Sequence, residues 1–76
     1  MPDYVKRMLE EHRELKDRIQ KLNKFLDEKS NEDFNQEKLG YMYAQKCAME
    51  TYDFILAQRL SIECDEGNCT IEDLNS

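Results

Sequence analysis

The stretch Val5–Leu26, with the sequence VKRMLEEHRELKDRIQKLNKFL, decides the fold because its inward-facing residues follow a helical period. These residues alternate spacings of three and four, the a/d pattern of a heptad, at Val5, Met8, His12, Leu15, Ile19, Leu22 and Leu26. Leu9 and Phe25 widen the stripe, so this helix is expected to meet more than one neighbour. Pro2 and Asp3 suit a first helical turn. The pattern therefore predicts a helix from about residue 3 to about residue 27.

A second helix is predicted from about residue 36 to about residue 62, after a loop at about residues 28–35. The loop sequence is charged and contains Ser, Asn and Asp, which favour turns over helix interiors. Asn35 is placed as an N-cap for the helix that follows. Its apolar residues form two adjacent stripes, one of Leu39, Met42, Met49, Tyr52, Leu56 and Leu60 and one of Tyr41, Ala48, Ile55 and Ile62. Tyr41 and Tyr52 fall on these stripes, which favours core positions for both.

Two helices joined by a short loop predict an all-α antiparallel hairpin over residues 1–63. Two helices alone cannot bury apolar stripes this broad against each other, so we expect a homo-oligomer. On the opposite, polar face of the first helix, Glu14 precedes Arg18 and Asp17 precedes Lys21 by four residues. Pairs of this spacing and orientation stabilise a helix by roughly 0.2–0.5 kcal/mol each.

The composition of the 76-residue chain excludes several classes of protein. With 39% hydrophobic and 37% charged residues, no stretch approaches the roughly 18 apolar residues of a membrane span. The first 25 residues lack the apolar region of a secretory signal, so we expect a cytosolic protein, in the host cytoplasm if the protein is viral. Val5–Leu26 holds seven basic and four acidic residues, whereas five acids and no base follow from Glu63 onward. This polarity argues against duplex nucleic acid and leaves room for a compact anionic ligand.

Residues 64–76 lack periodicity and are expected to form an acidic, cysteine-containing, flexible tail. The three cysteines, Cys47, Cys64 and Cys69, cannot all pair within one chain, and a cytosolic setting favours free thiols. Whether Cys64 and Cys69 pair stays open. A zinc site would need more ligands than the tail offers, and no phosphate loop, HExxH motif or nucleophile elbow is present. We therefore expect no metal, no cofactor and no enzymatic activity. For His12, within the apolar stripe, a structural role is favoured over a functional one.

Two polar residues invite a binding role from their positions. Tyr4 lies in the first helical turn beside Lys6 and Arg7, where backbone N–H groups and basic side chains favour an anion. Arg59 interrupts the apolar face between Leu56 and Leu60, and either a carboxylate or a bound phosphate would pair with it. Within the same helix, Asp53 and Glu63 are the carboxylates in question.

The arrangement resembles a group of short bacteriophage proteins that are common in phages of gut bacteria. The resemblance spans residues 4–62 and rests on three helical-face motifs, Arg7-Met8-x2-Glu11, Glu14-Leu15-x2-Arg18-Ile19-x-Lys21-Leu22-x2-Phe25 and Met49-x2-Tyr52-x2-Ile55-Leu56-x2-Arg59-Leu60. The overall plan is also similar to the phage anti-CBASS sponge family. Members of that family form compact homo-oligomers, often hexamers, and sequester cyclic di- or trinucleotide signals between subunits without cleaving them.

The resemblance implies that this chain is a viral anti-defence sponge. It implies that Tyr4 stacks on a base and that Arg7, Arg18, Lys21 or Arg59 hold phosphates. An alternative from another class is a phage adaptor that blocks a host protein through its hairpin and acidic tail. A structural phage component is a third reading, with no positive signature in the sequence.

Overall fold

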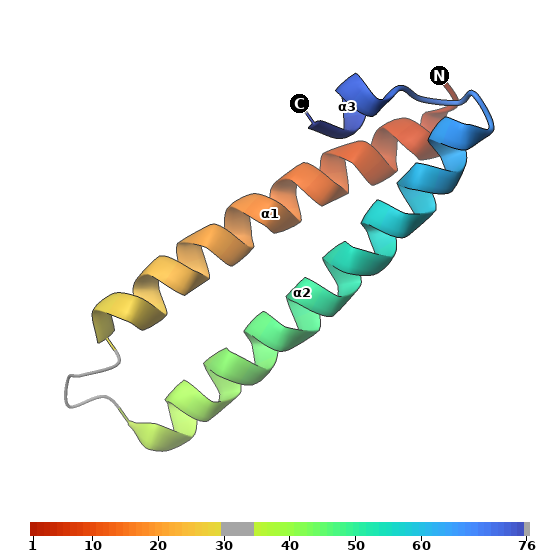
Figure 1. Ribbon diagram of the computed structural model, residues 1–76. Coiled ribbons are helices and arrows are strands. Elements are labelled where there is room, and N and C mark those ends of the chain that lie inside the picture. The colour runs from red at the N-terminus through yellow and green to blue at the C-terminus, as the bar shows by residue number, and fades with distance from the viewer. Residues whose placement is uncertain (30–34, 76) are drawn as a thin grey trace.

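The computed structural model describes residues 1–29 and 35–75, and in this part of the chain all regular structure is helical. Helix α1 spans Asp3–Lys29, α2 spans Gln36–Asp65 and α3 spans Ile71–Asn75. The two long helices run antiparallel, which confirms the predicted hairpin (Figure 1). Most of the predicted loop, at residues 30–34, lies outside the described residues. The molecule is an elongated rod with extents of 50 × 18 × 16 Å.

The main core lies in the half of the hairpin that contains the start of α1 and the end of α2. Leu56 and Leu60 are completely buried there between side chains of α1. The buried members of this cluster are Val5, Met8, Leu9, Leu15, Leu56, Leu60 and Cys69. Leu26 and Leu39 are buried near the loop end. Between these two ends Ile19 and Leu22 are only half-buried, so the predicted stripe of α1 faces α2 along its whole length but is well covered only at its ends.

Local sequence signals explain both ends of α2. At its start the side chain of Asn35 accepts hydrogen bonds from the backbone N–H groups of Glu37 and Lys38, at 2.9 and 3.2 Å, which confirms the predicted N-cap. At its end Gly67 adopts a φ of 84°, a conformation that favours glycine. The backbone N–H of Gly67 then bonds to the carbonyl of Cys64, and that of Asn68 bonds to the carbonyl of Glu63. This pattern is a Schellman motif, and it turns the chain back on itself.

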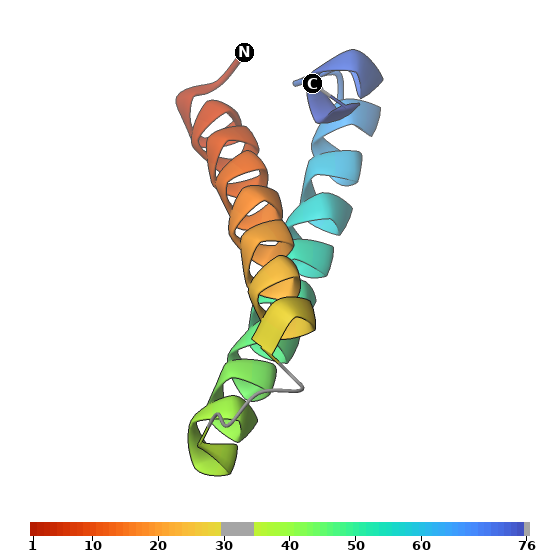
Figure 2. The same cartoon turned by 90° about the vertical axis from the view of Figure 1, so that its left-hand side faces the viewer.

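The segment after α2 packs on the hairpin, although the lack of periodicity in residues 64–76 predicted a flexible tail. The Cys69 thiol is buried and lies 3.5 Å from the Leu60 carbonyl, to which it donates. Leu74 of α3 and Cys64 pack against the same core. Helix α3 contacts α2, and Figure 2 shows it at the end of that helix. The C-terminal segment therefore contributes to the core, and its acidic side chains lie around that docked end.

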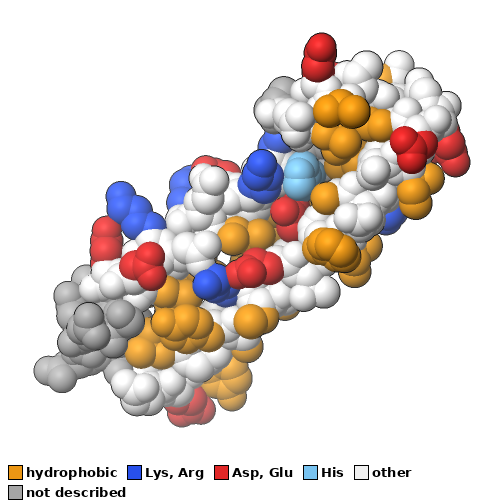
Figure 3. Space-filling view, viewed as in Figure 1, with side chains coloured by type: hydrophobic (Ala, Val, Ile, Leu, Met, Phe, Trp, Pro, Cys, Tyr) orange, Lys and Arg blue, Asp and Glu red, His pale blue; other side chains and the backbone are white. Residues whose placement is uncertain are grey.

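The two long helices differ in how they distribute polar residues. Helix α1 is strongly amphipathic, with its buried stripe on one side and exposed charges on the other. Helix α2 has almost no amphipathic asymmetry, because apolar side chains occur all round it. Its exposed large hydrophobic residues are Tyr41, Tyr43, Tyr52, Phe54, Ile55 and Ile62. The two long helices cross in the view of Figure 2. One face of the molecule shows hydrophobic side chains toward both ends and charged side chains around the histidine between them (Figure 3).

None of the helices among the described residues combines the length with the apolar character that crossing a membrane would require.

Candidate anion-binding grooves

The predicted ligand-binding residues share one flank of the hairpin. On α1, Tyr4 and Arg18 are fourteen residues apart, which is close to four full helical turns, and Arg7 and Lys21 lie beside the same line. On α2, Arg59 follows Gln45 at the same interval of fourteen residues. Four of the five predicted residues line two grooves along this flank, Arg18 and Lys21 in one and Tyr4 and Arg59 in the other. Arg7 is exposed and lines neither groove.

The first groove, which we call the cationic groove, has a volume of about 350 Å³. Arg18 and Lys21 from α1 and Gln45 from α2 supply its polar groups. Its apolar lining consists of Leu15, Leu22 and Met49. Among the described residues no carboxylate lines this groove, so those that line it carry two positive charges. Two cations over an apolar floor match a ligand that has phosphates and a planar apolar surface.

The two cations of this groove are held only loosely by acids of their own helix. Arg18 Nη2 lies 3.7 Å from Glu14 Oε2, and Lys21 Nζ lies 2.8 Å from Asp17 Oδ2, which confirms both predicted i,i+4 pairs. All four side chains are well exposed to solvent. Exposed pairs of this kind are worth less than about 1 kcal/mol, so a phosphate can replace the carboxylates at little cost.

The second groove, with a volume of about 220 Å³, combines Tyr4 and Met8 of α1 with Arg59, Ile62, Glu63 and Glu66 of the end of α2. Two carboxylates and one guanidinium give this lining a net negative charge, which disfavours a phosphate. The Tyr4 hydroxyl donates to both carboxylate oxygens of Glu63, at 2.6 and 3.0 Å. That hydrogen bond is the main reason why the pKa of the Tyr4 hydroxyl is raised. Arg59 forms no ion pair with the described residues, so neither carboxylate considered from the sequence holds it.

A second tyrosine, Tyr52, also bonds to a carboxylate of the facing helix. The Tyr52 hydroxyl donates to the Glu11 carboxylate across the helix pair, and this hydrogen bond raises the pKa of Tyr52. The core positions favoured for two tyrosines are wrong for the hairpin itself, because Tyr52 is 41% exposed and Tyr41 is 70% exposed. Tyr52 lies at the edge of the helix seam, where its hydroxyl reaches Glu11 of α1. Tyr41 lies on the side of α2 that points away from α1.

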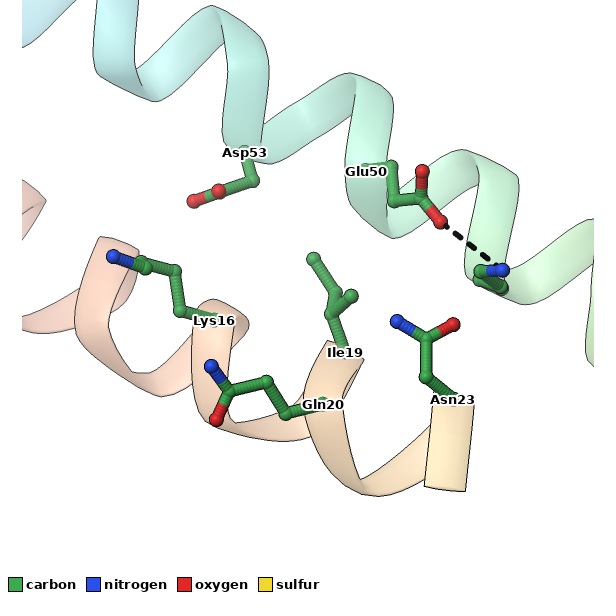
Figure 4. Close-up of a pocket in the computed structure, with 7 residues that line it drawn as sticks. Lys16, Ile19, Gln20, Asn23, Glu50 and Asp53 are labelled. Atoms are coloured by element: carbon green, nitrogen blue, oxygen red, sulfur yellow. Dashed lines mark ion pairs between the residues drawn. The ribbon is translucent and has the colours of Figure 1, made fainter. Parts of the chain in front are cut away.

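The opposite flank of the hairpin holds a third groove, of about 390 Å³, shown in Figure 4. Its residues from α1 are Lys16, Ile19, Gln20 and Asn23, and its residues from α2 are Lys46, Glu50 and Asp53. Lys46 Nζ lies 3.7 Å from Glu50 Oε1 within this group. Charges of both signs balance in the lining, so this groove offers no preference for an anion.

His12 has a structural environment that sequence spacing could not reveal. The residue is 8% exposed, and its Nδ1 lies 2.5 Å from Asp53 Oδ1 on the facing helix. Because a carboxylate oxygen only accepts, Nδ1 carries the proton of this hydrogen bond. The partner is 41 residues away in the chain, so only the folded hairpin brings the two together. The pair links α1 to α2 at the boundary between the core and the third groove.

Within residues 1–29 and 35–75 no group of three or more His, Cys, Asp or Glu side chains is placed to hold a metal ion. Sequence reasoning missed Gln45 and Met49, which complete the cationic groove from α2. Neither residue type signals binding by itself, and only the pairing of the two helices places them beside Arg18.

A sequence model of the Sequestin family matches residues 2–62, which include α1 and nearly all of α2. No curated protein and no solved structure matches the chain. The family match covers most of the chain and stops before the docked C-terminal segment. On this match, the chain belongs to the Sequestin family.

Proposed function

We propose that this protein is a non-catalytic viral sponge that binds a cyclic di- or trinucleotide immune signal and lowers its free concentration in the host cytoplasm. The family name supports a sequestering role. The observation that carries the ligand class is the cationic groove, in which Arg18 and Lys21 lie above an apolar floor without a lining carboxylate. In the proposal these two residues hold phosphates, and the apolar floor accepts a base. Tyr4, Arg7 and Arg59 lie on the same flank outside the cationic groove. In the proposal they contact a ligand that extends beyond this groove, or a second ligand molecule.

Sequestration requires binding without a chemical reaction, and the groove meets this requirement. A sponge must bind tightly and in stoichiometric amount, so it needs pre-positioned donors and no reacting group. Bidentate arginine and the ammonium of lysine are the usual phosphate partners. The open groove on a single chain would cover a cyclic dinucleotide on one side only. The proposal therefore includes a homo-oligomer, with a hexamer as the form implied by the resemblance, in which a neighbouring subunit covers the other side.

A thermal-shift screen of the purified protein against cyclic dinucleotides, cyclic trinucleotides and linear nucleotides tests the proposal. A ligand present at 1,000 times its Kd adds roughly 4 kcal/mol to the folded state. For a domain of this size that corresponds to a shift well above about 10 °C. A strong shift with one cyclic class, with intact ligand recovered after denaturation, supports the sponge. Flat curves across the panel, or recovery of a cleaved product, contradict it.

The adaptor alternative relies on the acidic C-terminal segment. Because this segment packs on the core, a useful test must change its charge without removing it. Deleting residues 64–76 would remove Cys69 from the core and destabilise the hairpin, so truncation confounds binding with folding. Neutralising exposed acids in the double variant Glu66→Gln/Glu72→Gln leaves that packing in place. A sponge retains its ligand-induced thermal shift in this variant. An adaptor that uses the acidic segment loses its host target while showing no nucleotide shift in either form.

A further inference from the structure

One exposed face of α2 carries no charge over most of its length. Its residues alternate spacings of three and four, the a/d pattern of a heptad, at Tyr41, Ala44, Ala48, Thr51, Ile55, Gln58 and Ile62, and we call this set the outer stripe. All seven are exposed, including Tyr41 at 70%, Ile55 at 48% and Ile62 at 57%. At about 1.5 Å per residue the stripe is roughly 30 Å long. An uncharged heptad stripe of this length in contact with water is typical of a helix that packs against a further helix.

The charges of α2 in this region lie on the other side, next to α1. Lys46, Glu50 and Asp53 line the third groove between the helices (Figure 4), and Asp53 is bonded to His12. Helix α2 thus has charged residues at the border of the helix seam, beside its buried leucines, and an uncharged stripe that faces outward. Because a helix surface that faces solvent is usually polar or charged, the uncharged stripe indicates that this face is covered in the functional state.

We infer that a second copy of this chain covers the outer stripe, with the two α2 helices antiparallel about a two-fold axis, and that Arg59 of the partner subunit completes the cationic groove. The inference that the two α2 helices pair depends only on the outer stripe. The assignment of a ligand to the completed groove rests on the proposed function.

Charge decides the antiparallel orientation. The C-terminal end of α2 carries Glu63, Asp65 and Glu66, and its first turns carry Glu37 and Lys38. A parallel pair would bring the six acids of the two C-terminal ends together and would align both helix dipoles. An antiparallel pair places each acidic end beside the partner's first turns, where Lys38 offsets Glu37. The second arrangement avoids the repulsion.

Side-chain size decides the register. In an antiparallel heptad pair each a residue meets a d residue of the other helix. Ile62 packs against the partner's Ala44 and Ile55 against the partner's Thr51, so that each large residue meets a small one. The two-fold axis then passes close to Phe54, which is 62% exposed at the border of the stripe. This register covers Phe54, Ile55 and Ile62, pairs each of the two isoleucines with a smaller residue, and brings the two copies of Phe54 together near the two-fold axis.

The same register adds a cation to the cationic groove. Gln45 and Arg59 are two heptads apart and therefore occupy the same heptad position. This position borders the outer stripe on the side of α2 that faces the cationic groove. In an antiparallel pair such positions face each other, so Arg59 of the partner subunit lies against Gln45. Gln45 lines the groove together with Arg18 and Lys21. Since Arg59 has no ion pair within the described part of its own chain, its guanidinium is available to the neighbouring groove. Each dimer then holds two grooves with three cations apiece.

Molecular mass in solution tests the pairing. Light scattering of the full chain is expected to give a dimer or a multiple of it. Ile55→Glu, on the outer stripe, is expected to give monomers of unchanged helix content. Ile71→Glu is the matched control, because Ile71 is 71% exposed but lies off the stripe in α3, and it keeps the mass of the parent chain. A monomeric parent chain, or an Ile55→Glu variant that keeps the parental mass, would overturn the inference.

Disulfide cross-linking tests the orientation in a Cys47→Ser background. Phe54→Cys lies next to the two-fold axis, so it is expected to form a covalent dimer under mild oxidation. Ile62→Cys faces Ala44 of the partner and is expected to stay uncross-linked. A parallel pair predicts the reverse, with ready cross-linking at residue 62 and little at residue 54, and that result would overturn the antiparallel arrangement.

Mixing variants tests the shared groove, with a cyclic dinucleotide or trinucleotide identified by the thermal-shift screen as the probe. Arg59→Ala and the double variant Arg18→Ala/Lys21→Ala are each expected to bind at least tenfold more weakly. Mixed dimers contain one intact groove out of two, so mixing the two proteins restores high-affinity binding to about half of the grooves in mixed dimers. Absence of recovery in confirmed mixed dimers would overturn the shared groove. A dimer that cross-links at residue 54 but binds no nucleotide in any form leaves the pairing intact and contradicts the proposed function.

Discussion

The two long helices are similar in length but opposite in design. Helix α1 presents one buried stripe to α2 and exposes its charges, as a helix of a two-layer structure does. Helix α2 buries Leu39, Leu56 and Leu60 against α1, places charges along the seam and exposes large apolar side chains on its far side. One neighbouring helix therefore covers the apolar surface of α1, whereas α2 needs two neighbours to cover its apolar surface. The surface of the chain that lacks a partner therefore lies on α2.

The largest expected effect is a difference in the free energy of unfolding between substitutions at two adjacent residues on opposite faces of α2. Leu56 is fully buried against α1, and Ile55 next to it is 48% exposed. Leu56→Ala should lower the free energy of unfolding by roughly 2–5 kcal/mol, because it leaves a cavity in the core. Ile55→Ala should change it by less than about 1 kcal/mol when measured at a concentration low enough for monomers. Urea unfolding of both variants measures the difference, and equal losses would show that the two faces are not distinct.

The His12–Asp53 pair tests how strongly polar groups in the seam hold the helices together. His12→Ala should cost roughly 1–3 kcal/mol, because Asp53 then loses its partner in a partly buried site. Glu10→Ala, at an exposed position of the same helix, is the control and should be nearly neutral. A double-mutant cycle with Asp53→Ala measures the coupling between the two side chains. A coupling energy near zero would mean that the contact does not hold the helices together.

A smaller effect is expected at the start of α2. Asn35→Ala removes the side-chain acceptor for two backbone N–H groups and should cost about 1 kcal/mol. Asn35→Asp keeps an acceptor at the same place and should retain most of the stability. Thermal unfolding followed by circular dichroism compares the three proteins. If alanine and aspartate behave alike, the cap does not contribute to the stability of α2.

The smallest effect concerns the docked C-terminal segment at alkaline pH. Burial, with a hydrogen bond to Cys64 as the second cause, raises the pKa of Cys69 from 9.0 to about 11. A raised pKa means that the folded state favours the neutral thiol. Its contribution to stability is therefore complete below about pH 9 and is lost as the pH rises through 11. Labelling of Cys69 by a thiol reagent in a Cys47→Ser/Cys64→Ser background should accelerate over this range more steeply than for a free thiol, while the long helices stay folded. Labelling that follows an unperturbed thiol would contradict the docking.

The sequence predicted the hairpin, the Asn35 cap and the ion pairs of Arg18 and Lys21, because each depends on neighbours within one or two helical turns. It did not predict the partner of His12, the burial of Cys69 or the groove formed by Gln45 and Arg18. Those contacts join residues far apart in the chain, and they depend on the rotation of each helix about its own axis. The exposure of Tyr41 and Tyr52 was missed for the same reason, since a stripe on a helix does not state which neighbour covers it.

The most direct test of the account is a calorimetric titration of the parent chain and of Arg18→Ala/Lys21→Ala with the cyclic nucleotide that gives the strongest thermal shift. We expect saturable, stoichiometric binding by the parent chain and an affinity at least tenfold lower for the variant, because each charged contact contributes roughly 1.5–3 kcal/mol. The ligand should be recovered intact. Equal affinities for the two proteins would place the ligand outside the cationic groove, and the absence of binding to the parent chain would contradict the sponge itself.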